Sequence, residues 1–166
     1  MKPLSLASRA TARTDPLTSD PESVSPERLP RVARLFFLVP RRSPLRWTLA
    51  LAAVVTSAAH VPVIGPHLAE APYMGALFIV LTVACGALAV VTLAFDAAAV
   101  YSIAVLTCGG AIVGYAATRL VSFPMLSDDM GNWLEPLGVV SIIAEAVVVG
   151  SALLALAPSA GTPAHR

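Results

Sequence analysis

Uncharged apolar runs are the main pattern along this chain. Residues 72–95 and 97–118 contain no charged side chain, and residues 136–157 contain only Glu145. A fourth run, residues 47–64, is shorter and includes His60 and Pro62. A helix needs about 20 apolar residues to cross a hydrocarbon core of roughly 30 Å. The pattern therefore predicts an all-α fold with four transmembrane helices.

The composition agrees with a membrane protein. The 166 residues are 57% hydrophobic and only 13% charged, and the mean hydropathy is +0.78. A soluble helical bundle would need a polar stripe on each helix at a 3.6-residue period. The two middle runs leave no room for such a stripe. Asp96 lies between these runs, where we expect it to be the N-cap of the third helix.

The two ends of the chain are predicted to be tails. Residues 1–46 are rich in arginine and proline and lack apolar periodicity, which is typical of disorder. Residues 158–166 form a short C-terminal tail after the fourth run. Lysine and arginine stand almost entirely before the first run, and only Arg119 and Arg166 lie elsewhere. Positive residues beside a span stay in the cytoplasm, so we expect both tails to be cytoplasmic in a multi-pass cell-membrane protein.

With this topology the two outer loops meet on one face, and they collect imidazole and carboxylate groups. Imidazole with carboxylate suits zinc or copper, and carboxylate alone suits calcium or magnesium. A divalent metal is therefore one hypothesis, with these ligands: His60, His67, Glu70, Asp128, Asp129 and Glu135. No cofactor is otherwise indicated, because no pair of ligands has a diagnostic spacing.

Simpler roles compete for the same outer residues. Arg119 needs a partner near the membrane surface, so it is expected to pair with one or two of these acids. Glu70 and Glu135 stand beside the starts of helices, where negative charge complements the helix dipole. His60 is then an interfacial residue that hydrogen-bonds a loop carbonyl.

Glu145 is the acid that falls inside a span. It lies nine residues after Pro136, which is about 14 Å into the membrane at about 1.5 Å per residue. An ionised carboxylate there is costly, so Glu145 should carry a proton or have a partner. Ser141 shares its helix face, and Thr82 and Thr107 reach a similar depth on other helices. Glu145 is then either a link between helices or a relay for a proton or ion.

Small residues mark one helix for close packing. Gly110 and Gly114 have the small-xxx-small spacing that lets a second helix approach. Cys85 and Cys108 fall within apolar runs, where a thiol behaves as a small hydrophobe.

Several segments resemble a group of small four-span integral membrane proteins from high-GC bacteria, over roughly residues 46 to 157. The resemblance implies architecture and topology. It implies no chemistry, because that group has no assigned activity. The segments that carry it are His60-Val-Pro62, Glu70-Ala-Pro-Tyr-Met-Gly75, Thr118-Arg119 and Asp128-Asp-Met-Gly-Asn-Trp-Leu-Glu-Pro-Leu-Gly138.

The function expected from the sequence is that of a non-enzymatic membrane component. The chain has no Ser-His-Asp order, no glycine-rich phosphate loop and no basic aromatic surface for nucleic acid. The expected partners are the lipid bilayer and either another membrane protein or a second copy of the chain. The leading interpretation is an accessory or partner-binding component. The alternative is a protein that handles metal ions or protons through the outer histidine and acid cluster and Glu145.

Overall fold

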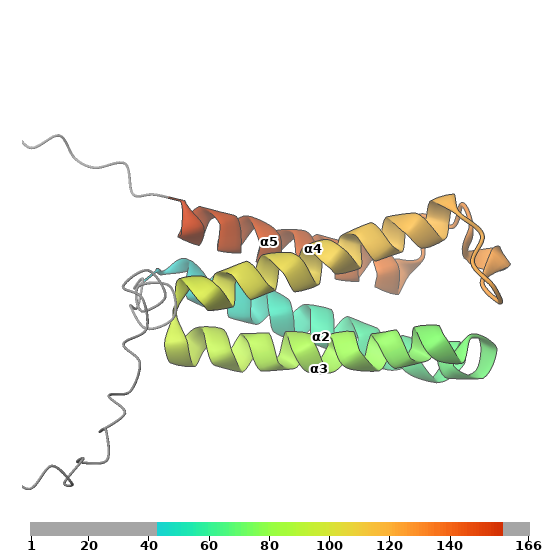
Figure 1. Cartoon of the computed structure of the whole chain (residues 1–166), viewed down its shortest axis with the longest axis horizontal. Helices are drawn as coiled ribbons and strands as arrows, with labels where there is room; N and C mark the ends of the chain where they lie inside the picture. Colours follow the sequence, from blue (N-terminus) through green and yellow to red (C-terminus); the bar gives the residue numbers. More distant parts are fainter. Residues whose placement is uncertain (1–42, 158–166) are drawn as a thin grey trace, which may run out of the picture.

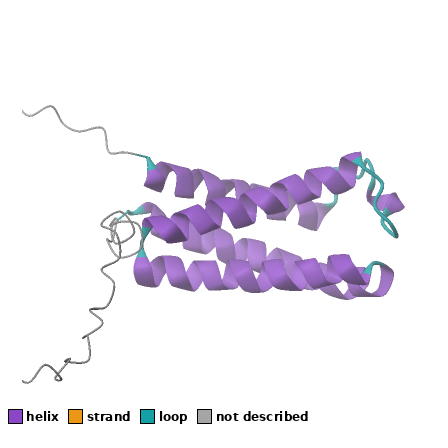
Figure 2. Cartoon of the chain, in the orientation of Figure 1, coloured by secondary structure: helices purple, strands orange, loops and turns teal. Residues whose placement is uncertain are grey.

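The computed structural model describes residues 43–157, which form an all-α fold (Figure 1, Figure 2). This confirms the predicted fold class and its four long helices. The predicted tails lie almost entirely outside the described residues, at 1–42 and 158–166. The helices are α2 (Leu45–Glu70), α3 (Pro72–Phe95), α4 (Ala98–Leu120) and α5 (Pro136–Leu156), with a short 3-10 helix η1 (Ser127–Asp129) between α4 and α5.

All four long helices have the length and the apolar composition needed to cross a bilayer. The shortest, α5, has 21 residues and is therefore about 31 Å long. The chain is a multi-pass membrane protein. Residues 43 and 157 lie at the same end of the bundle, as an even number of spans requires (Figure 1). Which end faces the cytoplasm stays a prediction from the arginine distribution.

The helices form an antiparallel bundle in which α2 packs against both α3 and α5 (Figure 1). Helix α4 packs mainly on α5 and more lightly on α3. The connections are short except for residues 121–135, which join α4 to α5 and are called here the connecting loop. The end of the bundle that carries this loop and the α2–α3 corner is called the loop end.

The core is built mainly from small and weakly polar side chains with a few large ones such as Leu49 and Tyr101, and most large apolar side chains face outward. On α3 the buried positions Cys85, Ala89 and Thr92 follow the three-and-four spacing of one helix face. Large residues such as Leu106 on α4 and Val90 on α3 are 75% and 69% exposed. Lipid tails cover such residues as well as a protein core does, so helix packing in a membrane relies on close contact between small side chains.

Helix α2 continues past the end predicted for the first span. The sequence prediction ends that span at residue 64, whereas the helix runs through Pro62 and Pro66 to Glu70. Proline keeps the φ value of a helix and removes one backbone donor. Two prolines therefore weaken this last part of α2 without ending it. The loop predicted between the first two spans is reduced to Ala71.

Asp96 does not have the predicted role of N-cap for α4. It ends α3 in the left-handed region, with φ 40°, and Ala97 is the N-cap of α4. Its carboxylate accepts hydrogen bonds from the Ser43 amide (3.1 Å) and the Tyr101 hydroxyl. The Arg46 Nη1 lies 3.8 Å away. Asp96 is 3% exposed, so it joins the start of α2 to the α3–α4 turn at the end opposite the loop end.

Candidate functional site

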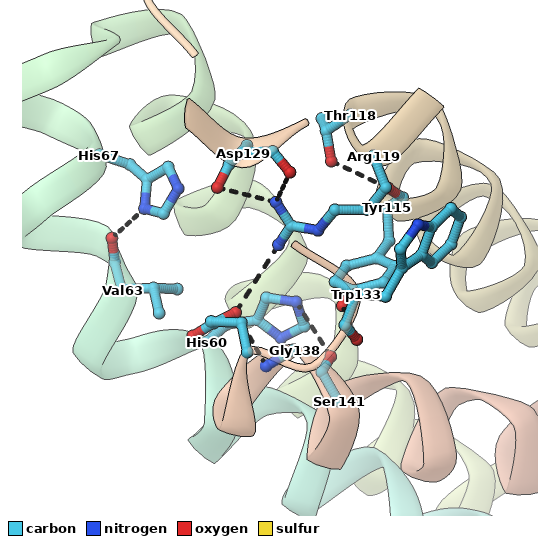
Figure 3. Close-up of polar contacts among 11 residues, drawn as sticks. His60, Val63, His67, Tyr115, Thr118, Arg119, Asp129, Trp133, Gly138 and Ser141 are labelled. Atoms are coloured by element: carbon cyan, nitrogen blue, oxygen red, sulfur yellow. Dashed lines mark hydrogen bonds and ion pairs between the residues drawn. The ribbon is translucent and has the colours of Figure 1, made fainter. Parts of the chain in front are cut away.

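Three polar side chains meet inside the bundle and are called here the buried triad: His60 on α2 and Ser141 and Glu145 on α5. Their exposed fractions are 5%, 6% and 2%. The Ser141 hydroxyl oxygen lies within hydrogen-bond distance of both partners, 3.0 Å from Glu145 Oε1 and 3.3 Å from His60 Nε2. His60 Nε2 and Glu145 Oε1 are 3.7 Å apart. Figure 3 shows His60 and Ser141 pointing toward each other across the two helices.

The backbone fixes one of the two protons of the imidazole ring. His60 Nδ1 lies 2.7 Å from the carbonyl oxygen of Thr56, one turn earlier in α2. A carbonyl can only accept, so Nδ1 carries a proton and donates it. Nε2 is then free to be an acceptor in the neutral ring or a donor in the charged ring. This nitrogen faces Ser141.

Two hydrogen-bond arrangements fit these distances equally well. In one, a protonated Glu145 donates to Ser141, whose hydroxyl donates to Nε2 of a neutral His60. In the other, a charged His60 donates to Ser141, whose hydroxyl donates to a carboxylate of Glu145. Both arrangements satisfy every member of the triad, and both have zero net charge. Moving two protons along the hydroxyl converts one arrangement into the other.

The surroundings of Glu145 differ between the two halves of the bundle. Toward the end with Asp96, the core holds the fully buried apolar side chains of Leu49 and Val148 and also the buried hydroxyl groups of Thr92 and Ser151. The hydrogen-bond contacts of Glu145 run toward the loop end, to Ser141 and through it to His60.

Glu145 does not bond the hydroxyl groups of Thr82 or Thr107, which the sequence places at a similar depth in the membrane. Its partner is Ser141 on its own helix, and Thr82 Oγ1 is buried without a hydrogen-bond partner among the described residues. His60 also differs from the expected interfacial residue bonded to a loop carbonyl, because it is buried and bonds within α2. The shared depth of His60 and Ser141 could have been predicted from the sequence. The two residues stand four and five residues inside the predicted outer ends of their spans.

A second polar cluster, built around Arg119, lies at the loop end. Arg119 is only 6% exposed although it is the penultimate residue of α4. Its Nη1 lies 2.7 Å from Asp129 Oδ1 and donates to the Asp129 carbonyl oxygen at 3.0 Å. Nη2 lies 3.8 Å from Glu135 Oε2, and the guanidinium stacks 4.6 Å from the centre of the Tyr115 ring. The expected pairing of Arg119 with outer acids is thus present (Figure 3).

Glu135 and Gly138 connect this cluster to the buried triad. The Glu135 side chain accepts from the Gly138 amide at 3.1 Å and so caps α5, as expected of an acid at a helix start. The Tyr115 ring passes so close to Gly138 that a Cβ there would lie 2.7 Å from Cε2. Ser141 follows one turn later. The close packing of Tyr115 against Gly138 was not predicted from the sequence.

The remaining predicted metal ligands make no direct contact with these clusters among the described residues, although the Phe78 ring lies 5.4 Å from the His60 ring and 4.7 Å from the His67 ring between centroids. His67 Nδ1 bonds the Val63 carbonyl oxygen at 2.8 Å, in its own helix. Glu70 and Asp128 are exposed. Within residues 43–157 no three histidine, cysteine or acidic side chains are grouped to hold a metal ion. The divalent-metal hypothesis stays a prediction.

The predicted packing positions on α4 are open. Gly110 and Gly114 are exposed, and nothing lies within 4 Å of a Cβ built at either one. Neither glycine is therefore required by packing within this part of the chain.

Comparison with known proteins returned no relative. No family model matches the sequence, and no curated protein or solved structure matches it. The four-span architecture implied by the resemblance to small membrane proteins is confirmed, and no family is identified.

Proposed function

We propose that this chain is a non-enzymatic membrane component whose activity is coupled to a proton held by the buried triad. The observation that carries this proposal is the continuous hydrogen-bond geometry from Thr56 through His60 and Ser141 to Glu145, inside a bundle of membrane-spanning helices. An ionisable side chain inside a membrane is costly and usually marks a pathway or a switch. Here the cost is reduced because His60 and Glu145 share one proton.

The proton count supports binding and release of a single proton. With one exchangeable proton the triad is neutral, wherever that proton sits. Losing it leaves one negative charge at about 14 Å depth, and gaining a second leaves one positive charge. Each charged state is costly in a low-dielectric interior. The triad is therefore suited to pass one proton at a time between Glu145 and the loop end.

Access to Glu145 is proposed to come from one side only. Ser141 and Glu145 are one turn apart, so the triad carries a proton about 6 Å along the membrane normal. Between Glu145 and the end opposite the loop end the core contains fully buried Val148 and Leu49, and among the described residues the buried hydroxyl groups of Thr92 and Ser151 are not hydrogen-bonded to Glu145. We place the loop end outside the cytoplasm, following the arginine distribution. The protein then senses or takes up protons from the outer side.

The test is chemical labelling of Glu145 with a lipid-soluble carbodiimide, which modifies a carboxyl group that carries a proton. The full-length protein in nanodiscs is treated over a pH series, and Glu145 modification is quantified by peptide mass spectrometry. We expect labelling to fall as the pH rises, because the triad gives up its proton. Ser141→Ala should shift the midpoint of this curve, since the hydroxyl links the two ionisable groups.

Ser102→Ala is the matched control, because within residues 43–157 the Ser102 hydroxyl bonds only the Ala98 carbonyl oxygen on α4. Its labelling curve should coincide with that of the unmodified protein. A static link between helices would hold its proton throughout. Labelling that stays constant from mildly acidic to strongly alkaline pH, in all three proteins, would therefore reject proton coupling.

Partner binding is the second candidate function. Gly110 and Gly114 are exposed on one face of α4, and no described residue packs against this face at either position. We propose that a helix of another membrane protein, or of a second copy, packs there. Gly110→Leu with Gly114→Leu should then reduce the size of the complex in native electrophoresis, and an unchanged size would count against this function.

A further inference from the structure

The connecting loop is a folded structure at the loop end. It contains η1, a buried Leu126 that is 2% exposed, and positive φ values at Met125 (65°) and Gly131 (78°). A residue such as methionine adopts positive φ only when its surroundings impose it. The conformation of the loop in this structure is therefore imposed by its contacts with the rest of the bundle.

Contacts from two helices fasten the middle of the connecting loop to the bundle. On α4, the Arg119 carbonyl oxygen accepts from the Gly131 amide at 3.0 Å, and the Arg119 guanidinium binds Asp129. The Tyr115 hydroxyl donates to the Trp133 carbonyl oxygen at 3.0 Å. On α3, the Tyr73 hydroxyl donates to the Pro124 carbonyl oxygen at 2.7 Å. The loop thus bridges the end of the bundle.

The Arg119 guanidinium contacts the connecting loop at two acids, and one of them stands at the start of the helix that carries the triad residues Ser141 and Glu145. One of its nitrogens holds Asp129 in the loop, and the other approaches Glu135, which caps the helix carrying Ser141 and Glu145. Its Nε is buried and has no partner among the described residues. A charge that is buried this deeply remains in place because its acidic partners compensate it. Figure 3 shows Arg119 between Asp129 and Tyr115.

We propose that residues 121–135 form a lid that Arg119, paired with Asp129, holds closed over the buried triad. The lid controls whether water at the loop end reaches His60 and Glu145. This inference rests on the proposed function, because it assigns the regulation of that same site. Opening requires the Arg119 and Asp129 pair to separate while the four helices stay packed.

Asp129→Asn and Asp128→Asn provide a matched comparison. The two acids are neighbours in η1, and each substitution removes one negative charge. Within residues 43–157, only Asp129 of the two forms an ion pair and a hydrogen bond with Arg119. The full-length proteins in nanodiscs are treated with a water-soluble carbodiimide and an amine, and Glu145 modification is measured by mass spectrometry. The lipid-soluble carbodiimide is used in parallel, because it reaches Glu145 through the bilayer.

We expect Asp129→Asn to raise the water-soluble labelling of Glu145 by about tenfold, which corresponds to weakening the closed lid by about 1.4 kcal/mol. Asp128→Asn should stay near the unmodified protein. Tyr73→Phe, which removes the fastening on α3, should give a smaller increase. Labelling by the lipid-soluble reagent should be equal in all four proteins.

Other outcomes separate the lid from the proposed function. If the lipid-soluble reagent labels Glu145 but Asp129→Asn does not exceed Asp128→Asn with the water-soluble one, the lid is rejected and proton coupling stands. An increase with both reagents indicates a loosened bundle and also rejects the lid. If neither reagent labels Glu145 at any pH, the proposed function fails together with the lid.

Discussion

Gly138 and Gly150 allow the packing beside the candidate site to be tested by the same substitution at two positions of one helix. A Cβ at Gly138 would lie 2.7 Å from Glu135 Oε2 and 2.7 Å from Tyr115 Cε2. At Gly150 nothing lies within 4 Å. Alanine is therefore expected to destabilise the protein at the first position and not at the second.

The magnitude follows from three contributions. Replacing glycine by alanine inside a helix stabilises by at most about 0.5–1 kcal/mol, at either position. At Gly138 the overpacking costs about 1–3 kcal/mol. Displacing the Glu135 carboxylate weakens the cap of α5, which costs about 1 kcal/mol. Gly138→Ala should thus lower the free energy of unfolding by about 1–3 kcal/mol, and Gly150→Ala should leave it unchanged or slightly raised.

The assay is unfolding titrated with sodium dodecyl sulfate in mixed micelles. Tryptophan fluorescence reports tertiary contacts while the helices persist, and Trp133 lies 6.3 Å from Tyr115 between ring centroids. Equal midpoints for Gly138→Ala and Gly150→Ala would refute the close approach of Tyr115 to α5. A lower midpoint for Gly150→Ala alone would refute the assignment of the open position.

Three further predictions use the same titration. Asp96→Gly and Asp96→Ala both lose the carboxylate, but alanine should cost about 1–2 kcal/mol more because φ at this residue is 40°; equal midpoints would contradict the left-handed turn. Arg119→Gln should cost about 2–3 kcal/mol, less than for a fully buried pair because Asp129 is 23% exposed at its side chain. Combining it with Asp129→Asn should add little, and full additivity would show that the two do not interact. Gly110→Leu with Gly114→Leu should leave the unfolding free energy unchanged or raise it by up to about 1–2 kcal/mol, since both positions are open and leucine is a better helix former than glycine, and a large loss would reveal packing against this part of the chain.

The four helices could be predicted because length and lack of charge are sufficient to identify a membrane span. Helix α5 and the depth of Glu145 follow directly from the position of Pro136, and the pairing of Arg119 with acids follows from the cost of an isolated charge. The end of α2 could not be predicted. Pro62 and Pro66 are read locally as helix breakers, whereas a proline interrupts only one backbone hydrogen bond and the flanking turns persist.

The triad was only partly predictable, because it depends on how two helices are rotated toward each other. The sequence brings Ser141 and Glu145 onto one face, but the contact with His60 requires α2 and α5 to be neighbours. Sequence order suggests instead that α2 lies next to α3 and gives no information about α5. The role of Asp96 was missed for the same reason, since its amide partner at Ser43 is 53 residues away.

The outward position of the large apolar residues has a consequence for calorimetry. The heat-capacity change of a soluble protein arises when buried apolar surface becomes exposed to water. In this bundle residues such as Leu106 and Val90 already face outward, and separated helices would remain in lipid with their backbone bonds intact. Unfolding within the bilayer should therefore have a heat-capacity change close to zero. The stability of the bundle should vary almost linearly with temperature, without a maximum and without denaturation in the cold.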